Sequence, residues 1–351
     1  MFRQFAGAEL ADPARPGSRS FSCRLTDLST IGQARRLAGA IGSQAGLDNA
    51  VLASLGLVVS ELAHNAVKHA GGGELVIRVL ASVPHAGVEV LCLDRGRGIP
   101  DVAESLRDGF STTGTMGTGL GAVRRLAQEF DIYSGVGQGT AVVARLHPGM
   151  ASVAARPARA AGLALPVADE TVSGDAWAAR SSGTRTVVLL VDGLGHGSGA
   201  AEAANVAIRL FHEYSAEDLA SLMTALSKGL RATRGAAAAL ADIDVARGEL
   251  HYIGVGNIAA RIVSGPTSHA LVSHNGIVGH PTRTLHVLTY PWPRDAMLVM
   301  HSDGITNHWK PDTYPGLFRR DPALVAGVLY RDHSRERDDR SVLACRQTAG
   351  P

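Results

Sequence analysis

Cysteine is scarce in this sequence, and neither sign of charge is in excess. The three cysteines, Cys23, Cys92 and Cys345, lie far apart and have neither metal-ligand nor redox spacing, which is typical of a reducing compartment. The 34 basic and 32 acidic residues leave a formal net charge of +2. Such a chain has no basic field for binding nucleic acid or an anionic membrane. We therefore expect a protein or small-molecule partner.

Long hydrophobic runs are also missing. Residues 1–17 contain no apolar segment of the kind found in signal peptides, and no later run approaches the uncharged length needed to cross a bilayer. We therefore expect a soluble, cytoplasmic protein. At 351 residues the chain is longer than one hydrophobic core usually organises, so two domains of ordinary size are expected.

The N-terminal part of the chain is predicted to form an α/β layer. Asp48 is the expected N-cap of a helix, because apolar residues recur at helical spacing from there to the glycines at 71–73. A Gly/Ser/Thr-rich stretch over 94–117 is long enough to indicate a functional loop. The remaining expected elements are strands at 75–80 and 88–93, a helix at about 120–129, and a hairpin with its turn at 135–139 and a strand at 140–146.

A change in composition marks the boundary between two domains. Residues 148–162 are rich in Ala, Pro, Gly and Arg and have no apolar period, as expected of a tether. We therefore divide the chain into an extension at 1–24, a first domain at 25–147, the tether, and a second domain at 163–351. Many short strands around two consecutive helices favour stacked antiparallel sheets flanked by helices in the second domain. The strands are expected at 186–191, 237–243, 249–255, 258–264, 285–290 and 296–301, and the helices at about 198–214 and 216–232.

Glu61 and Asn65 form the first candidate site. They are four residues apart on the predicted helix, so both side chains project from one face. An amide oxygen can contribute to an octahedral Mg²⁺ site completed by phosphates and water, and a neighbouring carboxylate can accept a proton from an attacking hydroxyl. Taken alone, the pair also fits a solvated face of an amphipathic helix.

Further motifs favour a nucleotide site. Asp94 begins where a strand ends, and its carboxylate can accept a hydrogen bond from an exocyclic amine such as that of adenine, while Gly96 and Gly98 permit close approach. The segment Gly117-Thr118-Gly119-Leu120-Gly121 opens a helix, where free N–H groups and the helix dipole favour phosphate. Thr140 then follows the hairpin turn.

In this order, the motifs resemble the GHKL ATP-binding fold, also called the Bergerat or HATPase fold, over about residues 25–147. Glu61 and Asn65 match its N-box, and the two glycine motifs match its G-boxes. The second glycine motif and its flanks look most like the small anti-sigma-type, RsbT-like serine/threonine kinases. This resemblance implies that Glu61 is a general base, that Asn65 is the Mg²⁺ ligand, and that Asp94 and Thr140 contact adenine. Residues 107–116 would form a lid over the phosphates of bound ATP.

Four acidic motifs form the second candidate site. They are Ser173-Gly174-Asp175, the run from Asp192 and Gly193 to Gly197, Ser302-Asp303-Gly304, and Asp338-Asp339. Carboxylates brought together by a sheet attract hard divalent cations, and two such ions can activate water and clamp a phosphoryl group. Any single Asp-Gly pair is more often a turn. Repetition beside predicted strands favours a two-metal hydrolase centre.

These acidic motifs resemble the PPM superfamily, specifically the SpoIIE-like and RsbX-like serine/threonine phosphatases, over about residues 163–346. The resemblance implies two Mn²⁺ or Mg²⁺ ions, with Asp192 bridging them. The implied ligands are Asp175, Asp192, Asp303, Asp338 and the Gly193 carbonyl. Ser341 stands where the family usually has Thr, and the aspartate pair leaves Asp338 and Asp339 open as ligands, of which we choose Asp338. His196 matches a histidine in the corresponding motif of the family, where it would be either a general acid or a structural turn residue.

The predicted fold class is therefore α+β, with a GHKL α/β sandwich followed by a PPM-type β-sandwich flanked by helices. The leading hypothesis is a switch enzyme whose ATP- and Mg²⁺-dependent kinase half and metal-dependent phosphatase half act in one sigma-factor or stress-signalling pathway. The resemblance implies STAS-domain proteins as substrates. An alternative makes the first domain a nucleotide-gated binding module without turnover, and a third treats both halves as degenerate scaffold. Glu61 favours chemistry, because binding alone needs no base.

Overall fold

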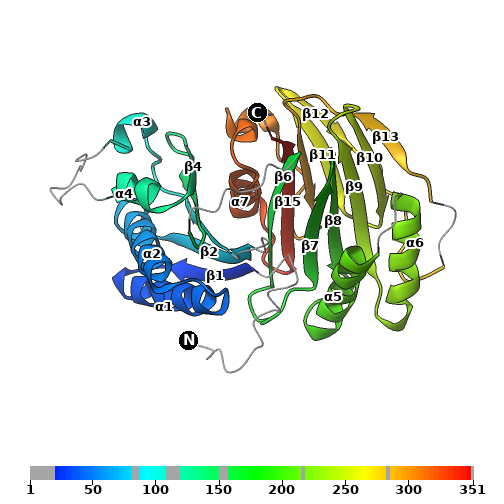
Figure 1. The fold of residues 1–351 in the computed structure, drawn as a ribbon, viewed down its shortest axis with the longest axis horizontal. Coiled ribbons are helices and arrows are strands. Elements are labelled where there is room, and N and C mark those ends of the chain that lie inside the picture. The colour runs from blue at the N-terminus through cyan, green and yellow to red at the C-terminus, as the bar shows by residue number, and fades with distance from the viewer. Residues whose placement is uncertain are drawn as a thin grey trace.

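The structure is a computed structural model that describes residues 20–80, 87–107, 119–149, 157–214, 218–281 and 285–348. Within these residues there are three five-stranded antiparallel sheets, with helices on the outer faces of the first and second sheets and one helix, α7, between the first and third (Figure 1). The first sheet has the strand order β1-β2-β3-β5-β4, the second β13-β10-β9-β8-β7 and the third β12-β11-β14-β15-β6. Mixed helices and antiparallel sheets confirm the predicted α+β class.

The first sheet carries its helices on one face. Alternate residues along its strands, such as Leu75, Ile77 and Val90, pack against the buried sides of α1 and α2, as the period of two in a strand requires. The helices in this half are α1 (Leu28–Gln44), α2 (Asn49–Ala70), α3 (Val102–Ser105) and α4 (Gly119–Leu126). The strands are β1 (Ser20–Leu25), β2 (Gly73–Leu80), β3 (Gly87–Asp94), β4 (Glu129–Ser134) and β5 (Thr140–Leu146).

Helix α2 confirms the predicted helix and both of its ends. Oδ1 of the N-cap Asp48 accepts hydrogen bonds from the N–H groups of Ala50 and Val51, each at 2.9 Å. Gly71 ends the helix in the left-handed conformation with φ of 72°, which glycine adopts without a steric cost.

Helix α2 also corrects the expectation about hydrophobic runs. Within the described residues, it is long and apolar enough, by length and composition alone, to cross a membrane. Buried core helices meet the same criterion, and α2 packs residues such as Leu55, Val59 and Leu62 into the core of the first half.

The second and third sheets stack face to face. Trp177, Leu190 and Tyr252 of the second sheet meet Leu298 and Leu343 of the third in one buried cluster, which is the core of a β-sandwich. Helices α5 (Ser198–Glu213) and α6 (Leu219–Gly229) cover the outer face of the second sheet. The strands are β6 (Ala158–Leu165), β7 (Asp175–Ser182), β8 (Arg185–Gly193), β9 (Ala236–Asp244), β10 (Glu249–Val255), β11 (Ala259–Ser264), β12 (Thr267–Ala270), β13 (Leu288–Pro291), β14 (Met297–His301) and β15 (Arg340–Gln347).

Helix α7 (Pro322–His333) lies between the two halves (Figure 1). It packs on β6 and β15 of the third sheet and on β3 and β5 of the first. All residues from Pro322 to Arg331 are buried. Leu91 and Val143 of the first sheet therefore share one buried apolar cluster with Leu163 and Val299 of the third. The halves are joined by a hydrophobic core in addition to their tether.

Buried ion pairs reinforce this junction. The guanidinium of Arg145 on β5 pairs with Glu89 at 2.7 Å and with Asp321, the N-cap of α7, also at 2.7 Å. Arg78 pairs with the same Glu89 at 2.8 Å. Each of these side chains is at most 8% exposed, and charges this deeply buried are tolerated only when paired.

Several boundaries differ from the sequence-based expectation. Residues 158–162, predicted as part of the tether at 148–162, form the start of β6, and Ser20–Arg24 of the predicted extension at 1–24 belong to β1. Of the α-helices and strands in the described residues, eight were not predicted, namely α1, α3, α7, β1, β6, β7, β12 and β15, of which α3 lies within the loop expected at 94–117. Residues 150–156 of the tether and 1–19 of the extension lie outside the described residues.

Candidate functional site

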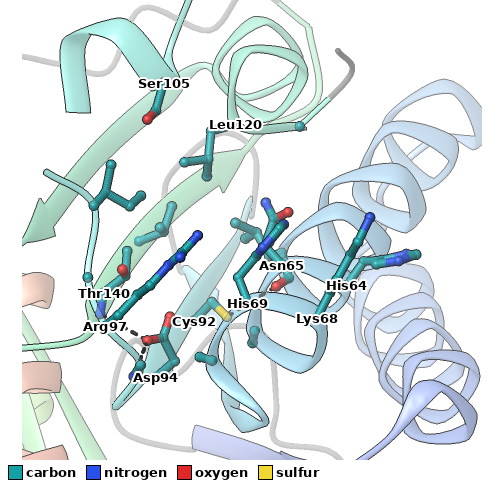
Figure 2. A pocket seen from close by; sticks show the side chains of 18 of the residues that line it. His64, Asn65, Lys68, His69, Cys92, Asp94, Arg97, Ser105, Leu120 and Thr140 are labelled. Atoms are coloured by element: carbon teal, nitrogen blue, oxygen red, sulfur yellow. Dashed lines mark hydrogen bonds between the residues drawn. The ribbon is translucent and has the colours of Figure 1, made fainter. Parts of the chain in front are cut away.

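A cavity of about 710 Å³ opens in the first half between α2, the end of β3 and α4. Figure 2 shows its lining, to which α2 contributes His64, Asn65, Lys68 and His69. Most residues of the predicted nucleotide site line this cavity, namely Glu61, Asn65, Asp94, Gly96, Gly98, Gly119, Leu120 and Thr140. The structure thus brings together segments that are up to 79 positions apart, from Glu61 to Thr140.

Asp94 is held at the base of this cavity by backbone donors. Its Oδ1 accepts hydrogen bonds from the N–H groups of Gly96 at 2.8 Å and Thr140 at 3.1 Å. Burial raises the pKa of the Asp94 carboxyl, and these bonds and the charge of Arg331 act in the opposite direction. Since Oδ1 is occupied, Oδ2 is the oxygen left to accept from a ligand.

The two glycines after Asp94 are required by close packing. A Cβ on Gly98 would lie 1.9 Å from the carbonyl oxygen of Gly135, and its φ is 73°. A Cβ on Gly96 would lie 2.5 Å from the Cβ of Ala70 on α2. Both positions therefore let the loop pass directly between α2 and the β4–β5 turn.

The second glycine motif is only partly described. Gly119 and Leu120 at the start of α4 line the cavity, whereas Gly121 is buried inside the domain and does not. Gly117 and Thr118, with most of the predicted lid at 107–116, lie outside the described residues.

Basic side chains in the cavity lining were not predicted. Lys68, His69 and Arg97 all line it, and the first two lie one turn beyond Asn65 on the same helix. The spacing of three and four residues from Asn65 is the signal that could have identified them. The positive charges of Lys68 and Arg97 suit a phosphorylated ligand, whereas burial and these two charges lower the pKa of His69 and favour its neutral form.

The second acidic site is built at the ends of sandwich strands. Asp175 and Asp192 are direct neighbours in the antiparallel pair β7–β8, and the N–H of Gly193 donates to the carbonyl of Gly174 at 3.0 Å. Asp175 is 4% exposed, and its Oδ2 accepts a hydrogen bond of 2.6 Å from the hydroxyl of Ser302. Ser302 therefore ties the third motif to the first, a contact that the sequence did not reveal.

The third and fourth acidic motifs also meet. Burial is the largest cause of the raised pKa of Asp303, and the charge of Asp338 and a hydrogen bond with its side chain raise this pKa further. Asp303 also accepts from the amide of Asn257 at 2.7 Å. The four predicted ligand side chains thus belong to one electrostatic cluster, since Asp175, Asp303 and Asp338 all raise the pKa of Asp192.

The neighbouring aspartates Asp338 and Asp339 have different surroundings. Asp339 is 2% exposed, and its two oxygens accept from the N–H groups of Val167 at 2.8 Å and Gly174 at 2.6 Å. Asp338 is partly exposed and faces Asp303. Asp339 therefore already has a structural role. Oδ1 of Asp338 accepts from the N–H of Asp339 at 2.9 Å, so Oδ2 is the oxygen of Asp338 that is left for a ligand.

The chemistry of this cluster fits divalent cations. Burial is the largest cause of the raised pKa of Asp175 and Asp192, and mutual repulsion among the carboxylates raises both further. Bound cations would relieve this repulsion, and oxygen ligands are those that Mg²⁺ and Mn²⁺ prefer. Among the described residues, no group of three or more His, Cys, Asp or Glu side chains is already placed to hold a metal ion. Binding of a cation would therefore require movement of these side chains, or additional ligands from backbone oxygens or water.

Two further side chains flank the loop after Asp192. His196 is 61% exposed at its side chain, and its Nδ1 lies 3.0 Å from Oε1 of Glu170, so the imidazole has a partner that orients it. Arg234 lies against the start of α5, where a Cβ on Gly199 would come within 2.6 Å of the guanidinium carbon. The sequence offered no motif for Arg234, because it approaches the loop only through folding.

Two family models match the chain. Residues 25–146 match the histidine kinase-like ATPase domain, and residues 182–347 match stage II sporulation protein E, SpoIIE. The two matches fall on the two halves described above. They cover the candidate nucleotide cavity and most of the acidic cluster, with Asp175 just before the second match.

Curated relatives from Bacillus subtilis (strain 168) divide in the same way. The serine/threonine-protein kinase RsbT is 37% identical over 111 residues, which are 32% of this chain and 84% of the relative. The phosphoserine phosphatase RsbX is 25% identical over 139 residues, which are 39% of this chain and 69% of the relative. A structure solved in work on the bacterial stressosome is 26% identical with a TM-score of 0.51, and covers 54% of this chain and 99% of its own.

Proposed function

Because the chain belongs to the RsbT family through its histidine kinase-like ATPase domain and continues as a SpoIIE-type phosphatase domain related to RsbX, we propose that it is a cytoplasmic bifunctional switch enzyme. Its first half phosphorylates serine or threonine on a partner protein with ATP. Its second half removes phosphate from a protein of the same pathway. The observation that carries the proposal is the convergence of Glu61, Asn65 and Asp94 on one cavity.

The residues of the first half fit the parts of a phosphoryl transfer. The carboxylate of Glu61 would accept the proton of the attacking hydroxyl, whose oxygen bonds to the γ-phosphorus as the bond to the ADP leaving group breaks. Asn65 would hold Mg²⁺ with the phosphates. Asp94 would accept from the exocyclic amine of adenine, with Thr140 beside it.

The residues of the second half fit hydrolysis of a phosphoserine or phosphothreonine ester. Two divalent cations would polarise the attacking water and neutralise phosphate charge. Asp192 would bridge them, and Asp175, Asp303, Asp338 and the Gly193 carbonyl would complete the protein ligands. Hydrolysis would release inorganic phosphate and the free hydroxyl of the partner.

We further propose a STAS-domain antagonist or scaffold protein as the partner. RsbT and RsbX are a named kinase and a named phosphoserine phosphatase from one bacterium, and one similar structure comes from work on the stressosome. A chain that combines relatives of both enzymes is suited to setting the phosphorylation level of one shared protein.

The test uses the full chain with its co-purified partner, ATP, Mg²⁺ and Mn²⁺, with mass spectrometry of phosphate on the partner. Glu61→Ala should bind ATP but transfer no phosphate, since the base contributes little to ground-state binding. Asp192→Asn should phosphorylate the partner and leave it phosphorylated after ATP is removed, at every Mn²⁺ concentration. Near wild-type transfer by Glu61→Ala would contradict the assignment of Glu61 as the general base. ATP binding without any transfer in the wild type would favour the nucleotide-gated binding module. Turnover by Asp192→Asn at any Mn²⁺ concentration would refute the two-metal assignment.

A further inference from the structure

Arg331, in the last turn of α7, reaches from the phosphatase half to the base of the nucleotide cavity. Its Nη1 donates to the main-chain oxygen of Asp94 at 2.8 Å. Its Nε and Nη2 donate to the two carboxylate oxygens of Asp332, each at 2.8 Å. Arg331 is 8% exposed, and a guanidinium this buried is held in place by the bonds that satisfy it.

Gly139, in the β4–β5 turn, leaves room for the guanidinium of Arg331 beside Asp94. Gly139 has φ of 72°, and a Cβ there would lie 2.1 Å from the main-chain oxygen of Asp94 and 2.9 Å from Nη1 of Arg331. Any larger residue would separate the two groups. The β4–β5 turn, Asp94 and Arg331 therefore form one close-packed unit directly beneath the cavity.

The residues that follow Arg331 are fixed to the Asp303 loop. The N–H of Arg335 donates to the carbonyl of Gly304 at 2.8 Å, and the N–H of Thr306 donates to the carbonyl of His333 at 2.9 Å. Ser334 and Ile305 form an antiparallel bridge. Residues 331–335 therefore touch Asp94 at one end and the neighbour of Asp303 at the other.

Tyr314 holds the middle of the segment. Its hydroxyl lies 2.9 Å from Nε2 of His333 and donates to Oδ2 of Asp332 at 3.2 Å. Side-chain and main-chain bonds thus run without a break through residues 331–335. A shift of the segment at one end would be transmitted to the other, because close-packed units do not deform continuously.

We propose that Arg331 is a positioning residue of the nucleotide site, supplied by the phosphatase half, and that residues 331–335 couple nucleotide occupancy to the Asp303 loop. The inference rests on the proposed function of both sites. Arg331 fixes the main chain of Asp94 while backbone donors fix Oδ1, so the remaining oxygen is presented to the base of the nucleotide. By linkage, any effect of nucleotide on the metal site has an equal counterpart in the effect of metal on nucleotide affinity.

The positioning role is tested by base discrimination in the full chain. ATP carries an exocyclic amine that Asp94 can accept from, whereas ITP carries a carbonyl oxygen in its place. Arg331→Met should weaken ATP binding by about tenfold and weaken ITP binding much less, so the preference for ATP falls. Arg331→Lys should retain part of the preference for ATP. The lysine ammonium can still donate to the carbonyl of Asp94, but it lacks the several N–H donors of the guanidinium.

The matched control for this titration is Arg320→Met. Arg320 is 48% exposed at its side chain and pairs with Asp131 across the same junction, at 3.3 Å. We expect this variant to keep the wild-type preference. An unchanged ATP-to-ITP ratio in Arg331→Met would overturn the positioning role. If Arg331→Met does not fold, a wild-type ratio in Arg331→Lys overturns it equally.

The coupling is tested by hydrolysis of p-nitrophenyl phosphate with Mn²⁺, with and without saturating AMP-PNP. We expect AMP-PNP to change kcat/KM at least threefold in the wild type and in Arg320→Met. In Arg331→Met the ratio of kcat/KM with and without AMP-PNP should approach one, even at nucleotide concentrations that saturate the variant. If the wild type binds nucleotide and hydrolyses p-nitrophenyl phosphate, but AMP-PNP does not change kcat/KM, the coupling is overturned and the proposed function is not. Absence of either activity would overturn the proposed function and this inference with it.

Discussion

At the scale of single residues, the surroundings of a side chain decide whether it stabilises the fold or serves chemistry. Asp338 and Asp339 are adjacent and chemically identical. Asp339 gives both oxygens to backbone N–H groups, while Asp338 faces Asp303. The two aspartates should therefore respond differently to the same substitution.

Asp339→Asn should lower the free energy of unfolding by about 1–3 kcal/mol. The two carboxylate oxygens each accept from a different backbone N–H, and the NH₂ group of asparagine replaces one of these oxygens with a donor. Asp338→Asn should abolish phosphatase activity and leave the free energy of unfolding nearly unchanged. Urea denaturation and p-nitrophenyl phosphate hydrolysis of both variants measure the two effects. The reverse pattern would make Asp339 the ligand.

Asn65→Ala should abolish ATP binding, because it removes the proposed Mg²⁺ ligand and with it the ion that neutralises the phosphates. Asn49→Ala makes the same chemical change at the exposed start of the same helix and should bind ATP normally. Equilibrium titration with a fluorescent ATP analogue compares the two. Unchanged affinity in Asn65→Ala would contradict the assignment of the N-box.

The sequence predicted those site residues whose neighbours are fixed by local geometry. Glu61 and Asn65 share a helix face, and Asp94 stands at a strand end before two glycines, so their placement follows from helix period and turn chemistry. Ser302, Arg331 and Arg234 reach their sites only through tertiary packing. No spacing in the sequence records those contacts.

At the scale of elements, α7 was the most consequential omission. It is buried all round, because it packs on a sheet to either side, so it lacks the polar face from which an amphipathic helix is predicted. Glycines at positions 32, 39 and 42 in α1 interrupted its apolar period in a similar way. By contrast, α2 has a capping aspartate, a clear period and a glycine end, so its limits were predicted within a residue or two.

Asp321 at the N-cap of α7 predicts acid sensitivity of the junction. Burial alone would raise the pKa of Asp321, but the hydrogen bond and charge of Arg145 hold it well below its usual range. A carboxyl whose pKa is lower in the folded than in the unfolded state stabilises the fold above its unfolded pKa of about 4. This contribution is lost as pH falls below that value.

Asp321→Asn should therefore lower the free energy of unfolding at pH 7 by about 1–3 kcal/mol, since it removes one of the two buried carboxylates that pair with Arg145 and leaves Glu89 as the other. The difference from wild type should shrink as pH falls below about 4. Urea denaturation across pH 3 to 7 measures it, with Arg320→Met as an exposed junction control that should cost less than about 1 kcal/mol. Asparagine is as good an N-cap as aspartate, so a pH-independent difference would show that an altered hydrogen bond to Arg145, rather than the charge of Asp321, is responsible.

At the scale of the whole molecule, the two halves share one buried core. The sequence predicted two domains joined by a tether, and the structure adds a buried face between them at α7. The shared face was not predictable, because residues such as Leu91, Leu93 and Val143 fit the core of a two-sided sheet as well as an interface.

We therefore expect the full chain to unfold in a single cooperative transition. A fragment of residues 20–149 should melt at a lower temperature and bind the dye ANS, because the face that α7 covers becomes exposed. Differential scanning calorimetry of chain and fragment measures this. Two separate transitions in the full chain, one at the melting temperature of the fragment, would show that the halves fold independently.

The position of α7 in both cores has a consequence for the abundance of the two activities in a cell. If the second half unfolds, the first sheet loses its covering helix, and if the first half unfolds, α7 loses the sheet that covers it. In either case the remaining half becomes open to proteolysis. The halves should then share one half-life as well as one gene product, so their molar ratio stays at unity while expression varies. Under the proposed function, the steady-state phosphorylation of the partner would depend on the catalytic constants of the two halves and would be insensitive to the copy number of the enzyme.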